Sequence, residues 1–174
     1  RALEMARKAP EDPEWLAPLG AASFKPVPAA WSDAIAALSP QQCASSIAES
    51  IAECKSQGLI GAGFLEHNRS SEAFATSAGF FGLHHGTRVG LTTTARTPDG
   101  TGSGWADTGG VGSFDALGAT RIACRKAKQS QGARPLEAGH YQVVLEPAAL
   151  SDLMGYFLGA LDARAVDEGR SCFS

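Results

Sequence analysis

Residues 88–96 read RVGLTTTAR, and apolar residues alternate there with small polar ones. A period of two predicts a β-strand with one buried face, because successive side chains of a strand point to opposite sides of the sheet. The turn-forming residues at 78–79 and 98–100 bound this strand. We also expect a turn at residues 68–71, which read NRSS. Three further strands are expected, over residues 59–67, 73–77 and 102–108. Consecutive strands joined by short turns indicate an antiparallel meander.

One helix is predicted before these strands in the sequence, and another after them. Residues 39–42 read SPQQ, which combines a serine N-cap, a proline in the first turn and a capping-box glutamine. They predict a helix over residues 39–57, with Ile47, Ile51 and Cys54 on its inward face. A second helix is expected over residues 113–130, with Ser113 as its cap. Its inward positions are Leu117, Ala119, Ile122, Ala123 and Ala127, and its outward ones are Arg121, Arg125, Lys126 and Lys128.

The two ends of the chain carry weaker signals. Residues 1–8 are expected to form a short helix, followed by a proline-rich surface loop. The loop would be anchored by Trp15, Leu16, Phe24 and Trp31. Near the other end, we expect a short strand over residues 141–145 and a helix over residues 147–162. The inward side chains of that helix would be Leu150, Leu153, Met154, Phe157, Leu158 and Leu161. The fold class is therefore α+β: an antiparallel meander flanked by helices, followed by a short strand-helix unit.

Composition excludes several classes of protein. The 174 residues are 44% hydrophobic and 19% charged, which is typical of a globular domain and not of a disordered one. The net charge of −3 argues against a strongly basic nucleic-acid-binding protein. No stretch of about 18 apolar residues predicts a membrane helix. The four cysteines include no C-x-x-C pair. We therefore expect reduced thiols, no cysteine zinc site and a cytoplasmic location.

A glycine-rich segment, PDGTGSG at residues 98–104, is the most distinctive local feature. It does not fit a phosphate-binding loop, which needs a helix directly after it, because the strand pattern continues at Trp105. A hairpin turn followed by a glycine-lined strand fits better. Glycine in a strand often marks the close approach of another backbone, so a peptide pairing along this edge is an alternative. The candidate peptide-binding residues are Gly100, Gly102, Ser103 and Gly104.

No residues in the sequence form a recognisable catalytic set. His67, His84 and His85 lie near predicted turns, but no carboxylate or thiol stands at metal-ligand spacing beside them. We therefore expect no metal site and no catalytic residue in this chain. The basic row of the second helix is explained by an exposed face and by the helix dipole.

The order of features resembles the TldD/PmbA family, also described as modulators of DNA gyrase or peptidase family U62. The residues that carry the resemblance are ATSAG at 75–79, GLTTTAR at 90–96, PLEAGHYQVVLEP at 135–147 and GRSCF at 169–173. The resemblance implies that residues 1–133 are the family's central α+β domain. It also implies that residues 134–174 begin a truncated C-terminal domain. The chain, which does not begin with Met, would then be a fragment.

This family has two branches, and the resemblance decides between them at one helix. The TldD branch carries an H-E-x-x-x-H motif on the helix after the VVL strand, where two histidines and a glutamate would hold and use zinc. The equivalent helix here, residues 148–159, has no His and no Glu, and Asp152 is its only acid. The chain therefore looks like the PmbA branch, also called TldE. Zinc would be held by a TldD-like partner.

Three functions follow as hypotheses. In the first, the chain is the metal-free accessory subunit of a heteromeric zinc metalloprotease that cleaves unfolded peptides during peptide maturation in the cytoplasm. It would bind a TldD-like subunit and a peptide, but neither nucleic acid nor membrane. In the second, it is a non-enzymatic binding or scaffold homo-oligomer. In the third, it is an enzyme whose site lies in the missing C-terminal region.

Overall fold

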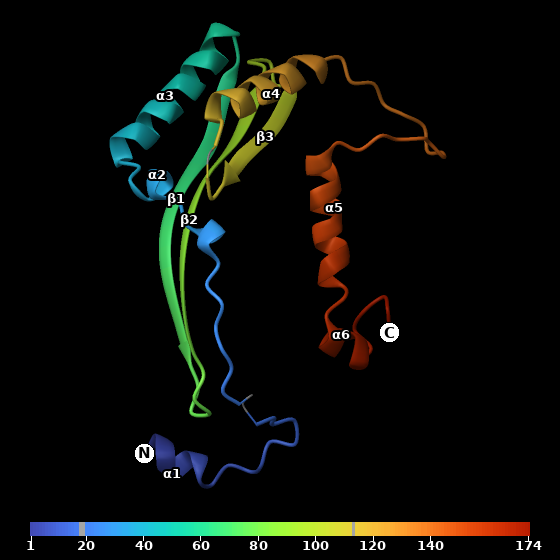
Figure 1. Ribbon diagram of the computed structural model, residues 1–174. Helices are drawn as coiled ribbons and strands as arrows, with labels where there is room; N and C mark the ends of the chain where they lie inside the picture. Colours follow the sequence, from blue (N-terminus) through green and yellow to red (C-terminus); the bar gives the residue numbers. More distant parts are fainter. Residues whose placement is uncertain (18–19, 113) are drawn as a thin grey trace.

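The computed structural model describes residues 1–17, 20–112 and 114–174. Its centre is a three-stranded antiparallel sheet of β1 (Ile60–Ala75), β2 (Phe81–Arg96) and β3 (Ser103–Gly110), in the order β1-β2-β3 (Figure 1). The α+β class and the meander are therefore confirmed. β3 pairs only with the second half of β2, from Val89 to Arg96. The first half of β2 and the end of β1 extend beyond β3 as a two-stranded ribbon.

The expected turn at residues 68–71 was wrong. Asn68 lies opposite Arg88 and Ser71 opposite His85, so β1 runs through these residues without a break. Their polarity reflects an exposed ribbon, in which the partner strand already satisfies the backbone groups. Arg69 also donates from its guanidinium to the Ala36 carbonyl oxygen at 3.1 Å. The turns at 78–79 and 98–100 are confirmed.

Helices α3 (Pro40–Ser56) and α4 (Ala116–Gln129) cover one face of the sheet. α3 begins with the predicted capping box, in which Ser39 and Gln42 each accept a hydrogen bond from the other's backbone N–H. α4 is capped by the Asp115 carboxylate, which accepts from the Gly118 N–H at 2.8 Å. The proposed cap Ser113 lies outside the described residues. The buried cluster beneath the helices contains Cys54, Leu59, Ala95, Ala106, Ala119, Ala123, Cys124 and Ala127.

The inward faces of these helices are narrower than predicted. Ile47 and Ile51 of α3 and Ile122 of α4 remain more than a third exposed. Small side chains make the contact instead, above all Ala123 and Ala127, because α4 lies very close to the sheet. The basic side chains of α4 are exposed, except for the half-buried Lys126.

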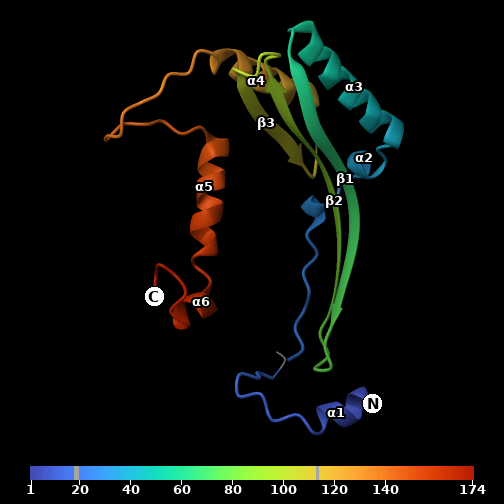
Figure 2. The same cartoon turned by 180° about the vertical axis from the view of Figure 1, so that it is seen from behind.

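The N-terminal segment contains α1 (Ala2–Ala6), the 3-10 turn η1 (Pro28–Ala30) and α2 (Asp33–Ala36). It runs along the part of β2 that β3 leaves uncovered (Figures 1 and 2). The Ser32 N–H donates to Thr87 Oγ1 at 3.0 Å, which fixes the segment to the strand. Phe24 and Trp31 lie against the ribbon, whereas Trp15 and Leu16, which were also predicted as anchors, are exposed. Ser32 caps α2, a helix that the sequence analysis did not predict.

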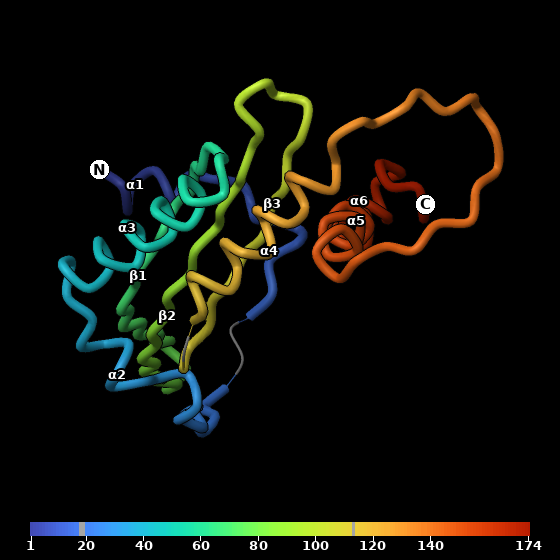
Figure 3. Tube along the Cα trace, turned by 90° about the horizontal axis from the view of Figure 1, so that it is seen from above, coloured from blue at the N-terminus to red at the C-terminus, as the bar shows by residue number. Residues whose placement is uncertain are grey.

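Beyond α4, residues 130–146 lead to α5 (Pro147–Gly159) and α6 (Ala163–Asp167), which stand apart from the sheet (Figure 3). The expected strand over residues 141–145 was wrong: the segment is extended but pairs with no strand in the described part of the chain. α5 ends at Gly159 and not at 162, and its predicted inward face was also wrong: the exposed side chains are Leu150, Leu153, Met154, Phe157, Leu158 and Leu161. None of the helices described here is both long and apolar enough to cross a membrane.

Candidate peptide-binding edge

The glycines at the start of β3 make room for α4. A Cβ atom at Gly104 would lie 2.2 Å from the Ala123 carbonyl oxygen and 2.5 Å from the Ala127 nitrogen. At Gly102 it would lie 2.1 Å from the Ala127 carbonyl oxygen. The predicted close approach of another backbone is therefore real, but the backbone belongs to α4 of the same chain.

The other two candidate residues are also held within the chain. Gly100 occupies the turn before β3 and adopts a positive φ of 74°. The Ser103 N–H donates to Ser130 Oγ at 2.8 Å, and that hydroxyl donates to the Ser103 carbonyl oxygen at 2.9 Å. A hydroxyl at the end of α4 thus occupies both backbone groups of Ser103. Peptide binding at Gly100, Gly102, Ser103 and Gly104 stays a prediction.

The open part of the β3 edge begins two residues later. In an antiparallel ladder, the backbone groups of alternate residues point toward the partner strand and away from it. The Thr97 N–H bonds the Gly102 carbonyl oxygen across the turn, whereas both Ser103 groups bond outward to Ser130. The same alternation directs the N–H and C=O groups of Trp105, Asp107 and Gly109 away from β2. Of these, the Trp105 carbonyl oxygen accepts from Lys126 Nζ at 2.8 Å.

The predicted peptide-binding residues lie in the turn before β3 and at its start, and they do not include Trp105, Asp107 and Gly109. The signal was present, because the period of two that places Gly104 under α4 also places Trp105, Asp107 and Gly109 on the opposite face. Within the described ranges, no helix packs on that face where the sheet has three strands, and η1 lies beside Gly86 on the two-stranded ribbon. Phe64 is 67% and Ile60 59% exposed there, and Trp105 is 36% exposed. An open strand edge beside an exposed apolar face can bind an extended peptide by adding a strand to the sheet.

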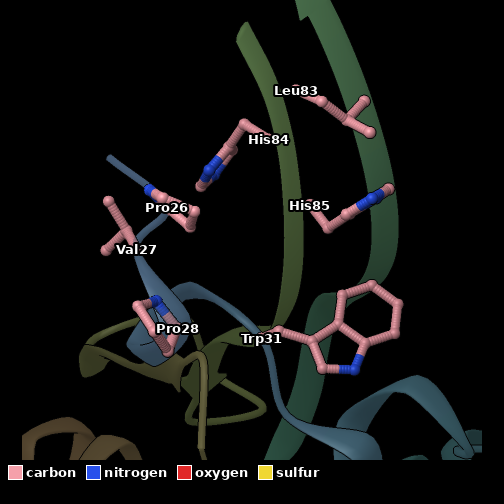
Figure 4. Close-up of a pocket in the computed structure, with 7 residues that line it drawn as sticks. All are labelled: Pro26, Val27, Pro28, Trp31, Leu83, His84 and His85. Atoms are coloured by element: carbon pink, nitrogen blue, oxygen red, sulfur yellow. The ribbon is translucent and has the colours of Figure 1, made fainter. Parts of the chain in front are cut away.

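A second hollow lies where the N-terminal segment crosses β2. Its volume is about 440 Å³, and its lining includes Pro26, Val27, Trp31 and His84 (Figure 4). His84 and His85 are neighbours on a strand and therefore point to opposite faces. His85 bonds Ser71 Oγ through Nδ1 at 2.8 Å and lies edge-on to Trp31.

The histidines do not come together as ligands. His67 Nε2 bonds the Ile35 carbonyl oxygen at 2.8 Å, well away from the His84 and His85 pair along the ribbon. No group of three His, Cys, Asp or Glu side chains in the described part of the chain could hold a metal ion. α5 carries Asp152 as its only acid and no His. The described residues therefore offer no ligand set for the zinc that the resemblance places in the TldD branch.

Two buried thiols join α3 to α4. Cys54 and Cys124 are almost fully buried, with their sulfur atoms 3.6 Å apart. Burial, helped by the hydrogen bond with Cys54, raises the pKa of the Cys124 thiol to about 12. Both cysteines are free thiols in the structure. A thiol held protonated in this way is a poor nucleophile, so the pair serves packing.

The fold and the open edge of β3 define the class of protein. It is an α+β domain whose sheet is covered by helices on one face and has an open edge along its last strand. Residues 33–131, more than half of the chain, match the family described as "PmbA/TldA metallopeptidase central domain". The chain therefore belongs to this metallopeptidase family, as the resemblance predicted. No curated protein and no solved structure matches it.

Proposed function

We propose that the chain is the metal-free accessory subunit of a two-subunit cytoplasmic metallopeptidase. The observation that carries this proposal is that α5, in a chain of this metallopeptidase family, lacks the residues that would bind a metal ion. The helix that would bear the H-E-x-x-x-H motif has neither its histidines nor its glutamate. Hydrolysis would take place on a zinc ion held by a TldD-like partner. The role of this chain is to help hold the unfolded peptide.

The open edge of β3 supports the peptide-holding role. Outward N–H and C=O groups on alternate residues can pair with any extended backbone, whatever its side chains. Such pairing suits a subunit that receives unfolded peptides, because an unfolded chain offers its own backbone groups for the same bonds. The exposed Phe64 and Trp105 add apolar contact beside the edge.

The proposal is tested by co-expressing the complete protein with a relative that bears H-E-x-x-x-H. The measurement is native mass together with zinc content, for the pair and for each protein alone. We expect a heteromer that carries one zinc per pair, while this protein alone binds none. A homo-oligomer that ignores the relative would support the scaffold hypothesis instead. Zinc bound by this protein alone would contradict the accessory role.

A further inference from the structure

We infer that the open edge of β3 contains a subsite for a basic side chain, so that the bound peptide is one with a lysine or arginine at a fixed position. This inference rests on the peptide-holding part of the proposed function. The subsite is a hollow of about 190 Å³ on the open face of the sheet, next to Asp107 and Gly109. Its remaining lining includes Phe64, Glu66, Arg88, Gly90 and Thr92.

Missing side chains form the floor of the hollow. Glu66, Gly90 and Gly109 lie side by side on the three strands, in one row of the ladder. Two of the three have no side chain, so the sheet is bare between Glu66 and the outer edge. A peptide strand paired with β3 would carry a side chain opposite Gly109 on this same face. That side chain can lie across the bare floor toward Glu66.

The charges around the floor favour a cation. Glu66 Oε1 accepts from Arg88 Nε at 3.0 Å, so one negative charge is already balanced. Asp107 has no ion-pair partner among the residues that the structure describes. The lining is therefore one negative charge in excess. The exposed Phe64 ring offers an apolar surface for the methylene stem of a lysine or arginine.

A second copy of the chain is a poorer occupant of the edge. Symmetric antiparallel pairing about the middle of the open segment would place Asp107 directly opposite Asp107 of the other copy. Like charges opposite each other destabilise a strand pair. An extended peptide with a basic residue brings the opposite charge to the same place.

The test uses fluorescein-labelled decapeptides of alternating threonine and valine that differ at one central residue, which is lysine, norleucine or glutamate. Fluorescence anisotropy gives the dissociation constant of each peptide for the full chain. We expect the lysine peptide to bind about tenfold more tightly than the norleucine peptide, and the glutamate peptide more weakly than both. Asp107→Asn should reduce the preference for lysine to threefold or less. The matched control Glu72→Gln removes the same charge on the distant ribbon and should leave the preference unchanged.

A second variant tests the shape of the hollow without removing charge. A Cβ atom at Gly90 would meet nothing closer than 3.6 Å, so Gly90→Ala folds without strain and fills the floor. It should also reduce the preference for lysine. Equal binding of the lysine and norleucine peptides would overturn the subsite. If N-methylation of alternate peptide amides still abolishes this equal binding, the peptide pairs with the backbone of β3, and only the subsite for a basic side chain is wrong. Absence of binding by every peptide would overturn both the subsite and the peptide-holding role.

Discussion

Both halves of β3 lie at the edge of the sheet, where the outward backbone groups have no partner strand in the described part of the chain, and the two halves differ in what lies beside these groups. At Gly102 and Gly104, α4 lies so close that no Cβ atom would fit, and Ser130 takes both backbone groups of Ser103. From Trp105 to Gly109, the one hydrogen bond to an outward backbone group among the described residues is that from the Lys126 ammonium to the Trp105 carbonyl oxygen. One half of the edge is therefore closed by the chain's own helix, and the other half is open to a partner. Glycine in a strand shows that something comes close, but not whether it belongs to the chain or to a ligand.

The largest effect is expected from filling the closed half. Gly104→Val would drive side-chain atoms into the Ala123 carbonyl, and α4 would have to leave the sheet. We expect a loss of about 3 kcal/mol or more in the free energy of unfolding, because overpacking here displaces a helix backbone and not a flexible side chain. Urea denaturation followed by circular dichroism measures it. Gly90→Ala is the matched control, and its stability should stay within about 0.5 kcal/mol of the parent protein. Similar losses for both variants would show that the close approach of α4 to Gly104 does not cause the loss.

The thiol pair makes the covered side sensitive to alkaline pH. The pKa of Cys124 is raised to about 12 in the folded protein, from an ordinary value near 9. As the pH rises, the Cys124 thiol therefore loses its proton in the unfolded chain before it does so in the folded protein. The free energy of unfolding falls as the pH rises from about 9 toward 12. We expect the parent protein to lose about 1 kcal/mol more than Cys124→Ala for each pH unit in that window. Urea midpoints at pH 8 and pH 10 under reducing conditions measure the difference. If the free energies of unfolding of the parent protein and Cys124→Ala changed equally with pH, burial of Cys124 would not be the cause of the alkaline sensitivity.

Ser130→Ala would move the boundary between the two halves. It removes the hydroxyl that bonds both backbone groups of Ser103, and we expect a loss of about 1 kcal/mol in stability. The variant also opens the edge by one more residue. Hydrogen exchange at the Ser103 amide should accelerate, while the Ala106 amide, which pairs with β2, should not change. An unaltered Ser103 amide would show that Ser130 does not close the edge.

The smallest effect is expected far from the sheet. Leu153 of α5 is exposed and is not part of the buried cluster beneath α3 and α4, so Leu153→Ser should change the stability of the sheet by less than about 0.5 kcal/mol. Thermal unfolding of the variant and the parent protein, compared side by side, checks this. A loss above 1 kcal/mol would mean that α5 packs against the sheet in solution.

The sequence predicted those helices and strands whose deciding residues lie close together in the chain. The capping box at Ser39 and the period of two around Leu91 each identified an element, because the deciding residues are adjacent in the sequence. The failures involve distant partners. Nothing near Asn68 shows that the strand continues, because its pairing with Arg88 comes from the far side of the hairpin. Likewise, apolar residues at 141–145 predict a strand only if a partner strand lies beside them.

The candidate site shows the same limit. Glycine at 102 and 104 correctly indicated a close backbone, but the sequence could not show that it belongs to α4. The open residues Trp105, Asp107 and Gly109 were available from the alternation, yet their exposure depends on which face the helices cover. That choice is made by Cys54, Ala123 and the other small side chains of the core.

Amide hydrogen exchange along β3 shows directly whether a peptide binds at the open edge. In the unbound protein, the outward amides of Asp107 and Gly109 should exchange quickly, and the inward amides of Ala106 and Thr108 slowly. When the lysine peptide is added, we expect the Asp107 and Gly109 amides to become protected, because they donate to the peptide backbone. Binding of the peptide with no added protection at these two amides would contradict the open edge as the binding site.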